Sequence, residues 1–275
     1  SRAAGKEAKV PSYYGGKFPL STYLAVRVRR LLADRKQQRD LPAPVKDWLS
    51  MQRCHSTLPG EEGLLVESFP RGGKHYMVCY PFEGRLAHQT LGMLLTRRME
   101  RRGLSPFGFV ASEYALAIWS LNPVADVNFL LSEDMMGDDL EEWLAESNLM
   151  KRTFRNVALI AGLIDRRHPG KEKTGRQMTF SSDLIYDVLR KYEPNHILLR
   201  ATQADAATGL LDIGRLGQML GRIQGRIEFR QLKRVSPLAV PLMLEIGREP
   251  VHGDSMEDLL SDAAEDLIKE ATRLI

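Results

Sequence analysis

The sequence predicts an α+β fold in which helices flank an antiparallel or mixed β-sheet. Segments rich in strand-forming residues occur in blocks, without the regular alternation with helices that is typical of α/β proteins. Helical patterns with one apolar face lie before, between and after these blocks. The chain has 275 residues, of which 43% are hydrophobic, so it is long enough to bury a substantial core.

The first element is a helix that follows an irregular segment. Prolines and glycines interrupt residues 1–20, which we therefore expect to lack regular structure. Ser21 or Thr22 can cap a helix over residues 23–32, and a second, shorter helix is predicted over residues 45–54.

Strands are predicted next, with a basic helix between two pairs of them. The strand-like segments are 63–69, 75–80, 107–112 and 114–119. The connection Pro70-Arg71-Gly72-Gly73 is typical of a β-hairpin. Residues 85–101 form an amphipathic helix, whose arginines near the C-terminal end complement the helix dipole.

The second half of the chain is mostly helical by pattern. Helices are predicted over 138–147, 148–166, 184–191, 197–206 and 212–223, and strands over 226–232 and 241–246. Ser181 or Ser182 can cap the third of these helices, and Ser255 with Asp258 forms a capping box before an acidic C-terminal helix. We expect residues 1–275 to be one domain, with an irregular segment (1–20), an α+β body (21–254) and a C-terminal amphipathic helix (255–275).

Composition narrows the classes of function. The net charge is +4, and acidic residues concentrate in 254–270, so the rest of the chain is more basic than the total indicates and favours a polyanionic partner. Cys54 and Cys79 are too few for a disulfide framework or a zinc site. No window holds eighteen apolar residues, so we expect a soluble, cytoplasmic protein without membrane contact. The chain begins at Ser1 in a basic stretch, and we expect it to be part of a longer protein.

The basic loop at residues 166–177 does not have the pattern of a nucleotide site. Gly170 and Gly175 have the spacing of a P-loop, but Arg176-Gln177 stands where Lys-Ser/Thr is required. A phosphate-contacting finger and a solvated connector remain the alternatives for this loop.

Residues that suggest catalysis are scarce. Acidic residues at 133–142 could hold a metal or act as acid and base, but acidic residues at a helix start also offset the helix dipole. The six histidines are scattered, and no GxSxG motif is present. We expect no catalytic residue and no metal site.

Aromatic and basic residues together predict a single-stranded nucleic-acid site. Tyr13, Tyr14 and Phe18 lie beside lysines, so their rings could stack on bases while cations pair with phosphates. The candidate contacts are Tyr13, Tyr14, Lys17, Arg97, Arg98, Arg101, Arg166, Arg167, Lys171, Lys173 and Arg176.

Several phrases, in this order, resemble the C-terminal part of Lhr-type DEXH-box helicases, and most of all the ligase-associated branch linked to bacterial DNA repair. They are residues 10–21 (VPSYYGGKFPLS), 70–84 with His88, 141–144 (EEWL), 149–155 (LMKRTFR), 193–200 (EPNHILLR) and 236–242 (SPLAVPL). The resemblance implies an ATP-dependent 3′-to-5′ translocase on single-stranded DNA. It also implies that an aromatic residue near the start of this module stacks on a base, which favours Tyr13.

This chain has neither a Walker A loop nor a DEXH box, so the resemblance places ATP and Mg²⁺ in the missing motor domains and no cofactor here. The expected partners are single-stranded DNA or a DNA/RNA hybrid, the helicase's own RecA-like and winged-helix domains, and a DNA ligase or nuclease. The leading hypothesis is a non-catalytic DNA-binding domain of a repair helicase. The alternatives are a protein-docking module that uses the acidic helix 255–273, and an independent hydrolase, which would need a deep pocket of perturbed carboxylates or histidines.

Overall fold

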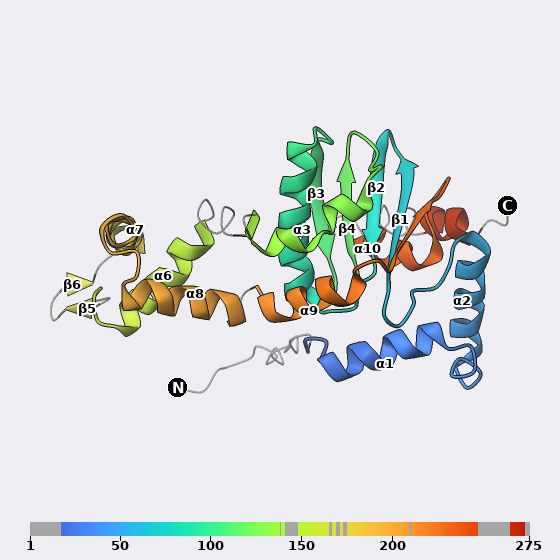
Figure 1. The fold of residues 1–275 in the computed structure, drawn as a ribbon, viewed down its shortest axis with the longest axis horizontal. Coiled ribbons are helices and arrows are strands. Elements are labelled where there is room, and N and C mark those ends of the chain that lie inside the picture. The colour runs from blue at the N-terminus through green and yellow to red at the C-terminus, as the bar shows by residue number, and fades with distance from the viewer. Residues whose placement is uncertain are drawn as a thin grey trace, which may run out of the picture.

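A five-stranded mixed sheet forms the centre of the computed structural model (Figure 1), which describes residues 18–137, 139–140, 148–164, 167–168, 171–172, 175–209, 211–246 and 265–272. The strand order is β3-β4-β2-β1-β7. The bounds are β1 Leu64–Arg71, β2 Lys74–Cys79, β3 Pro106–Ala111, β4 Leu116–Ser120 and β7 Ile227–Gln231. β7 pairs with β1 in parallel and the other pairs are antiparallel, so the predicted α+β class with a mixed sheet is confirmed.

The hairpin between β1 and β2 forms where the sequence predicts it. Gly72 and Gly73 have φ values of 57° and 72° between the paired residues Arg71 and Lys74. Two consecutive positive φ values match the twist of the flanking strands and suit glycine.

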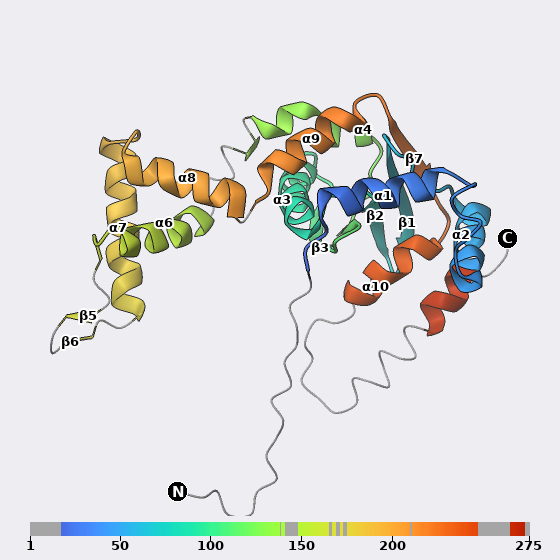
Figure 2. The same cartoon turned by 90° about the horizontal axis from the view of Figure 1, so that it is seen from below.

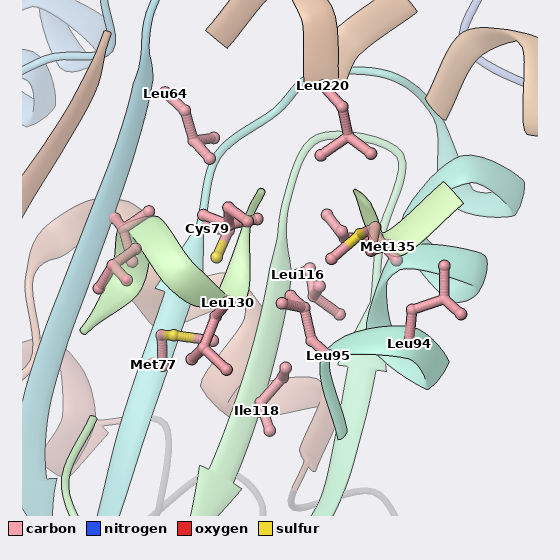
Figure 3. Packing of buried hydrophobic residues seen from close by; sticks show 14 of the residues in the cluster. Leu64, Met77, Cys79, Leu94, Leu95, Leu116, Ile118, Leu130, Met135 and Leu220 are labelled. Atoms are coloured by element: carbon pink, nitrogen blue, oxygen red, sulfur yellow. The ribbon is translucent and has the colours of Figure 1, made fainter. Parts of the chain in front are cut away.

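Strand residues alternate between two cores, one on each face of the sheet. Leu64 and Val66 of β1 join one core, while Leu65 and Phe69 join the other, as the two-residue period of a strand requires. The first core (Figure 3) is covered by α3 Arg85–Arg101, α4 Val127–Leu130, the 3-10 helix η1 Glu133–Met136 and α9 Ile213–Ile223. The second is covered by α1 Thr22–Ala33, α2 Ala43–His55, η2 Pro237–Ala239, α10 Val240–Ile246 and the helical residues 265–272.

A helical bundle extends to one side of this sheet (Figures 1 and 2). It contains α6 Asn148–Ile160, α7 Gly175–Tyr192, α8 Ile197–Gly209 and the small hairpin of β5 Arg167–His168 and β6 Lys171–Glu172. The bundle has its own core, in which the rings of Phe154 and Tyr186 meet edge to face at 5.4 Å. Met93 of α3 and Ile213 of α9 pack against this core and connect it to the body.

Three predicted elements differ from the structure. Residues 241–246 form helix α10 and not a strand, because a short buried apolar run has no period that separates the two, and Pro241 is tolerated in a first helical turn. The cap at Ser181 or Ser182 is wrong, since α7 is continuous from Gly175. α6 ends at Ile160, six residues before the predicted end, and Gly162 follows with φ 72°.

Two further predictions fall largely outside the described residues. Only residues 139–140 of the predicted helix 138–147 are described, and the capping box at Ser255 is not among them. The division into residues 1–20, 21–254 and 255–275 stays a prediction. Along the described ranges, no helix is both long and apolar enough to cross a membrane.

Candidate nucleic-acid interface

Leu20 fixes the start of the described chain to the body. Its backbone N–H donates to Oε2 of Glu113 at 3.0 Å, and its carbonyl accepts from Nη1 of Arg215 at 2.8 Å. The same Glu113 oxygen accepts from the backbone N–H of Arg85 at 3.1 Å. Leu20 is buried, so the segment before α1 is held between the β3–β4 turn and α9.

Two aromatic side chains on either side of this anchor face solvent. Phe18 is 95% exposed and Tyr23 is 91% exposed, although large apolar side chains are usually at least partly covered. Arg27 lies one helical turn after Tyr23 and is also exposed. We call Phe18, Tyr23 and Arg27 the N-terminal ring patch. Tyr23 and Arg27 share one side of α1, and Phe18 lies five residues before Tyr23 along the chain. Exposed rings near a cation suit stacked bases and a phosphate.

The sequence indicates only part of this patch. Tyr13, Tyr14 and Lys17 lie outside the described residues, and Phe18 is the next ring along the chain. Tyr23 is missed by the helical pattern, which assigns it to the apolar face of α1. The sequence does give one indication of its exposure. Tyr23 is the second residue of α1, so no preceding helical turn covers its side chain.

A buried cluster of charged residues around Glu83 connects α1 to α9. Glu83 Oε1 lies 2.7 Å from Nη1 of Arg29 and 2.9 Å from Nη2 of Arg222, and its Oε2 lies 3.6 Å from Nη2 of Arg215. Burial lowers the pKa of Arg222, and the nearby charge of Arg29 lowers it further. Arg215 also pairs with Asp212, whose Oδ2 lies 3.7 Å from its Nη1, so two carboxylates balance three guanidinium groups. The cluster therefore supports the fold and the adjacent anchor at Leu20.

Arg98, a predicted nucleic-acid contact, is enclosed by acceptors of its own chain. Its Nη2 lies 2.6 Å from Oδ1 of Asp134 and its Nε lies 2.5 Å from Oδ2 of Asp139. Its Nη1 donates to the carbonyl oxygen of Phe129 at 2.9 Å and to Oγ of Ser132 at 2.7 Å. Hydrogen bonds from Ser132 and Arg98 lower the pKa of Asp134. These acidic residues therefore act as counterions of α3.

The two neighbouring candidates on α3 differ from Arg98 in exposure. Arg101 shares Asp139 with Arg98, yet 46% of its side chain is exposed. Arg97 is half-buried. Arg101 therefore keeps part of its guanidinium accessible to a ligand.

The described candidates occupy two separate places, the end of α3 and the part of the bundle where the β5–β6 hairpin precedes α7. Arg97, Arg98 and Arg101 lie near the end of α3 that is far from Leu20, about 20 Å along the helix at a rise of 1.5 Å per residue. The backbones of Arg167 and Lys171 lie in the β5–β6 hairpin of the bundle, and Arg176 lies in the first turn of α7. Arg166 and Lys173 lie outside the described residues. The structure does not bring these groups into one compact site.

A buried histidine beside the anchor is used by the fold. His88 Nε2 accepts from the backbone N–H of Glu83 at 3.0 Å, and its Nδ1 lies 2.7 Å from the carbonyl oxygen of Ser112. Burial lowers the pKa of His88 to about 4, so the ring is neutral at pH 7. Over the part of the chain that is described, no three His, Cys, Asp or Glu side chains converge as metal ligands would.

Comparisons with known proteins agree on one kind of protein. The family model described as DEAD/H associated matches residues 58–239, which include all five strands of the sheet and the helical bundle. The chain is 21% identical to an ATP-dependent helicase Lhr-Core of Methanocaldococcus jannaschii, over 92% of this chain and 32% of that protein. It is 23% identical to an ATP-dependent helicase Lhr-Core protein 2 of Thermococcus barophilus, over 98% of this chain and 33% of that protein.

A solved structure has the same fold. The helicase Lhr of Mycobacterium smegmatis, bound to ssDNA and AMP-PNP, superposes with a TM-score of 0.64 at 20% identity, over 87% of this chain and 34% of that one. The chain thus spans about a third of the length of the proteins that it matches. The resemblance to Lhr-type helicases is confirmed, and the chain belongs to the DEAD/H-associated family.

Proposed function

We propose that this chain is a non-catalytic accessory domain that binds single-stranded DNA within an ATP-dependent, 3′-to-5′ Lhr-type helicase of DNA repair, acting in the cytoplasm. The observation that carries the proposal is the pair of exposed rings, Phe18 and Tyr23, on either side of the anchored Leu20. ATP and Mg²⁺ belong to motor domains outside this chain.

The ring patch suits bases because its rings are accessible and its backbone is fixed. Stacking of one base on an aromatic side chain contributes about 1–3 kcal/mol and does not depend strongly on sequence. Arg27 can pair with a phosphate next to a stacked base. Tyr13, Tyr14 and Lys17 would extend the patch along the segment before Leu20. The Mycobacterium smegmatis helicase, which has this fold, was solved with ssDNA, and this supports the choice of ligand.

The other candidates are proposed as secondary contacts. Arg101 has an accessible side, and the basic β5–β6 hairpin lies on the bundle, away from the sheet. Arg98 is left out of the proposed contacts, because its guanidinium is enclosed by Asp134, Asp139 and Ser132.

The test is the affinity of the chain for a fluorescently labelled single-stranded oligonucleotide, measured by anisotropy at low salt. We expect Phe18→Ala with Tyr23→Ala to weaken binding at least tenfold, about 1.4 kcal/mol, which is at the lower end of the stacking energy of a base. Tyr192→Ala removes another largely exposed ring, on α7, and serves as the control. Unchanged affinity of the double variant would refute the ring patch.

Salt dependence gives an independent check. Phosphate contacts release counterions, so the affinity of the wild-type chain should fall steeply as salt rises. The ring variant should keep this slope, because stacking releases no counterions. Binding that does not respond to salt would contradict arginine–phosphate contacts.

The second candidate is a docking module for other domains of the parent protein or for a ligase or nuclease. Apolar side chains on the bundle face solvent, among them Ile160 and Ile197, and the chain spans only a third of its relatives. The acidic C-terminal helix is less suited to bind a partner than its charge indicates, because one side of it is buried. Leu267 and Ala271 pack into the second core, and Glu270 Oε2 lies 3.1 Å from Nε of Arg71.

This second candidate needs variants that keep the helix folded. Glu265→Lys with Asp266→Lys reverses exposed charges and leaves the buried face of residues 265–272 unchanged. Loss of binding to a purified ligase or nuclease, with oligonucleotide affinity retained, would favour docking. Retained binding to those partners would show that the exposed charges of this helix do not dock them.

A further inference from the structure

A basic hollow lies between the turn that follows α1 and helix α2. These two elements meet at the lower right of Figure 1. Its volume is about 430 Å³, and it is lined by Arg35, Gln38, Arg39, Lys46, Ser50 and Arg53. Four of these six side chains are cationic and none is acidic. The sequence pattern missed this site, because its cations come from two segments that only the folded chain brings together.

The two sides of the hollow are built from regular geometry. Lys46, Ser50 and Arg53 have the spacing i, i+4, i+7, so they share one face of α2. Arg35, Gln38 and Arg39 come from the turn that follows α1. Lys46 Nζ donates to the carbonyl oxygen of Arg39 at 3.3 Å, which links the two sides.

One of the guanidinium groups is held in place by a buried amide. Gln38 is buried, and its Nε2 donates to the carbonyl oxygens of Leu31 and Leu32, both at 2.9 Å. These bonds orient its Oε1, which accepts from Nη2 of Arg53. Arg53 is therefore positioned before any ligand binds, which reduces the entropy lost on binding.

The charge of this hollow has no counterion among the described residues. Arg35, Arg39, Lys46 and Arg53 make no ion pair there, whereas Arg29, Arg98 and Arg222 each have a carboxylate partner. Asp34 is adjacent to Arg35 in the sequence, but its carboxylate bonds to other groups. It accepts from the backbone N–H of Lys36 at 2.8 Å and from Nε2 of Gln37 at 3.2 Å. Burial lowers the pKa of Arg53, and the charge of Arg35 adds to this effect. Four like charges around one hollow produce a local field that attracts an anion.

We propose that this hollow binds phosphoryl oxyanions. Guanidinium groups bind phosphate oxygens in a bidentate manner, and two or more such groups around one hollow favour a ligand with adjacent phosphates. The ligand is either the backbone of a nucleic-acid strand or a free polyphosphate. The site is separate from the N-terminal ring patch, because α1 has 12 residues and therefore spans about 18 Å. It does not depend on the proposed function of that patch.

The test uses the full chain with two probes at low salt. Inorganic pyrophosphate is titrated by calorimetry, and a labelled single-stranded oligonucleotide is titrated by anisotropy. The variant Arg39→Gln with Arg53→Gln removes two charges from the hollow. The matched control, Lys191→Gln with Arg200→Gln, removes two exposed charges from the bundle. Arg39→Gln with Lys46→Gln is a second variant, which keeps the bond between Gln38 and Arg53.

We expect both hollow variants to weaken phosphate binding at least tenfold, and the control to change it less than twofold. Loss of oligonucleotide affinity alone assigns the hollow to nucleic-acid phosphates, and loss of pyrophosphate affinity alone assigns it to a free polyphosphate. Phe18→Ala with Tyr23→Ala should leave pyrophosphate binding unchanged, so failure of the ring patch and failure of this site are distinguishable. Two results overturn the proposal. In one, the hollow variants bind both probes as tightly as the wild-type chain does. In the other, the control variant loses as much affinity as the hollow variants do.

Discussion

Arg98 of α3 and Asp139 form an ion pair with 2.5 Å between Nε and Oδ2, and both side chains are almost fully buried. Basic residues on a helix flank are usually solvated or bind a ligand, but here the segment after α4 folds over the guanidinium. A buried charge is tolerated only with its partner, so this contact fixes the residues after β4 on α3.

Arg98→Gln should therefore destabilise the fold. We expect the free energy of unfolding to fall by about 3 kcal/mol, because Asp139 would lose its buried partner. Urea unfolding followed by circular dichroism measures the change. Arg102→Gln is the control, since Arg102 is exposed and stacks on the ring of Phe129 at 3.6 Å, which contributes about 0.5–1 kcal/mol. Equal effects of the two variants would show that the ion pair is not structural.

Glu83→Gln tests the cluster that supports the anchor at Leu20. The amide has nearly the shape of the carboxylate, but it leaves Arg29 and Arg222 without a counterion. Arg215 keeps its pair with Asp212. We expect a loss of about 3–5 kcal/mol in the free energy of unfolding. Glu61→Gln breaks the more exposed pair with Arg30 and should cost less than about 1 kcal/mol. A loss for Glu83→Gln as small as that of the control would contradict this role.

His88 makes stability depend on pH. Its pKa is about 4 in the folded protein against an ordinary value of 6.5, so the unfolded chain binds the proton more readily. The contribution is fully present above pH 6.5 and is lost as pH falls toward 4, by about 3 kcal/mol in total. His88→Gln should flatten the dependence of the unfolding free energy on pH in this window. An unaltered slope in His88→Gln would refute the assignment.

Ser236→Ala tests a buried carboxylate that has neutral partners. Glu67 is buried in β1, where it accepts from Nε2 of Gln52 at 2.8 Å, from the hydroxyl of Tyr80 at 2.7 Å and from the hydroxyl of Ser236. Burial and the charge of Glu67 raise the pKa of Tyr80 well above its usual range.

Loss of one hydrogen bond to this charged acceptor should cost about 1.5–3 kcal/mol in the free energy of unfolding. Ser50→Ala, on the exposed face of α2, should change that free energy by less than about 0.5 kcal/mol. Thermal unfolding of both variants distinguishes them. A Ser236→Ala protein as stable as the wild type would show that Glu67 does not need this partner.

The sequence by itself determined the parts of the fold that depend on local pattern. The strand-forming residues Leu64, Leu65 and Val66 indicate a strand, and the Gly72-Gly73 pair predicts the turn after it. The apolar face of residues 85–101 predicts α3, and phrases spread along the chain identified the resemblance to Lhr-type helicases. Each of these predictions depends only on residues that are close together in the sequence.

Tertiary structure decided which of several chemically similar residues are buried in the protein interior. Arg98 and Arg101 look alike in the sequence, but only Arg98 is enclosed, because residues 129–139 fold onto that side of α3. Residues 241–246 could be strand or helix until the sheet placed them against its second face. The basic hollow exists only because the turn after α1 meets one face of α2. Burial and charge compensation arise from contacts between residues far apart along the chain, and no local pattern encodes them.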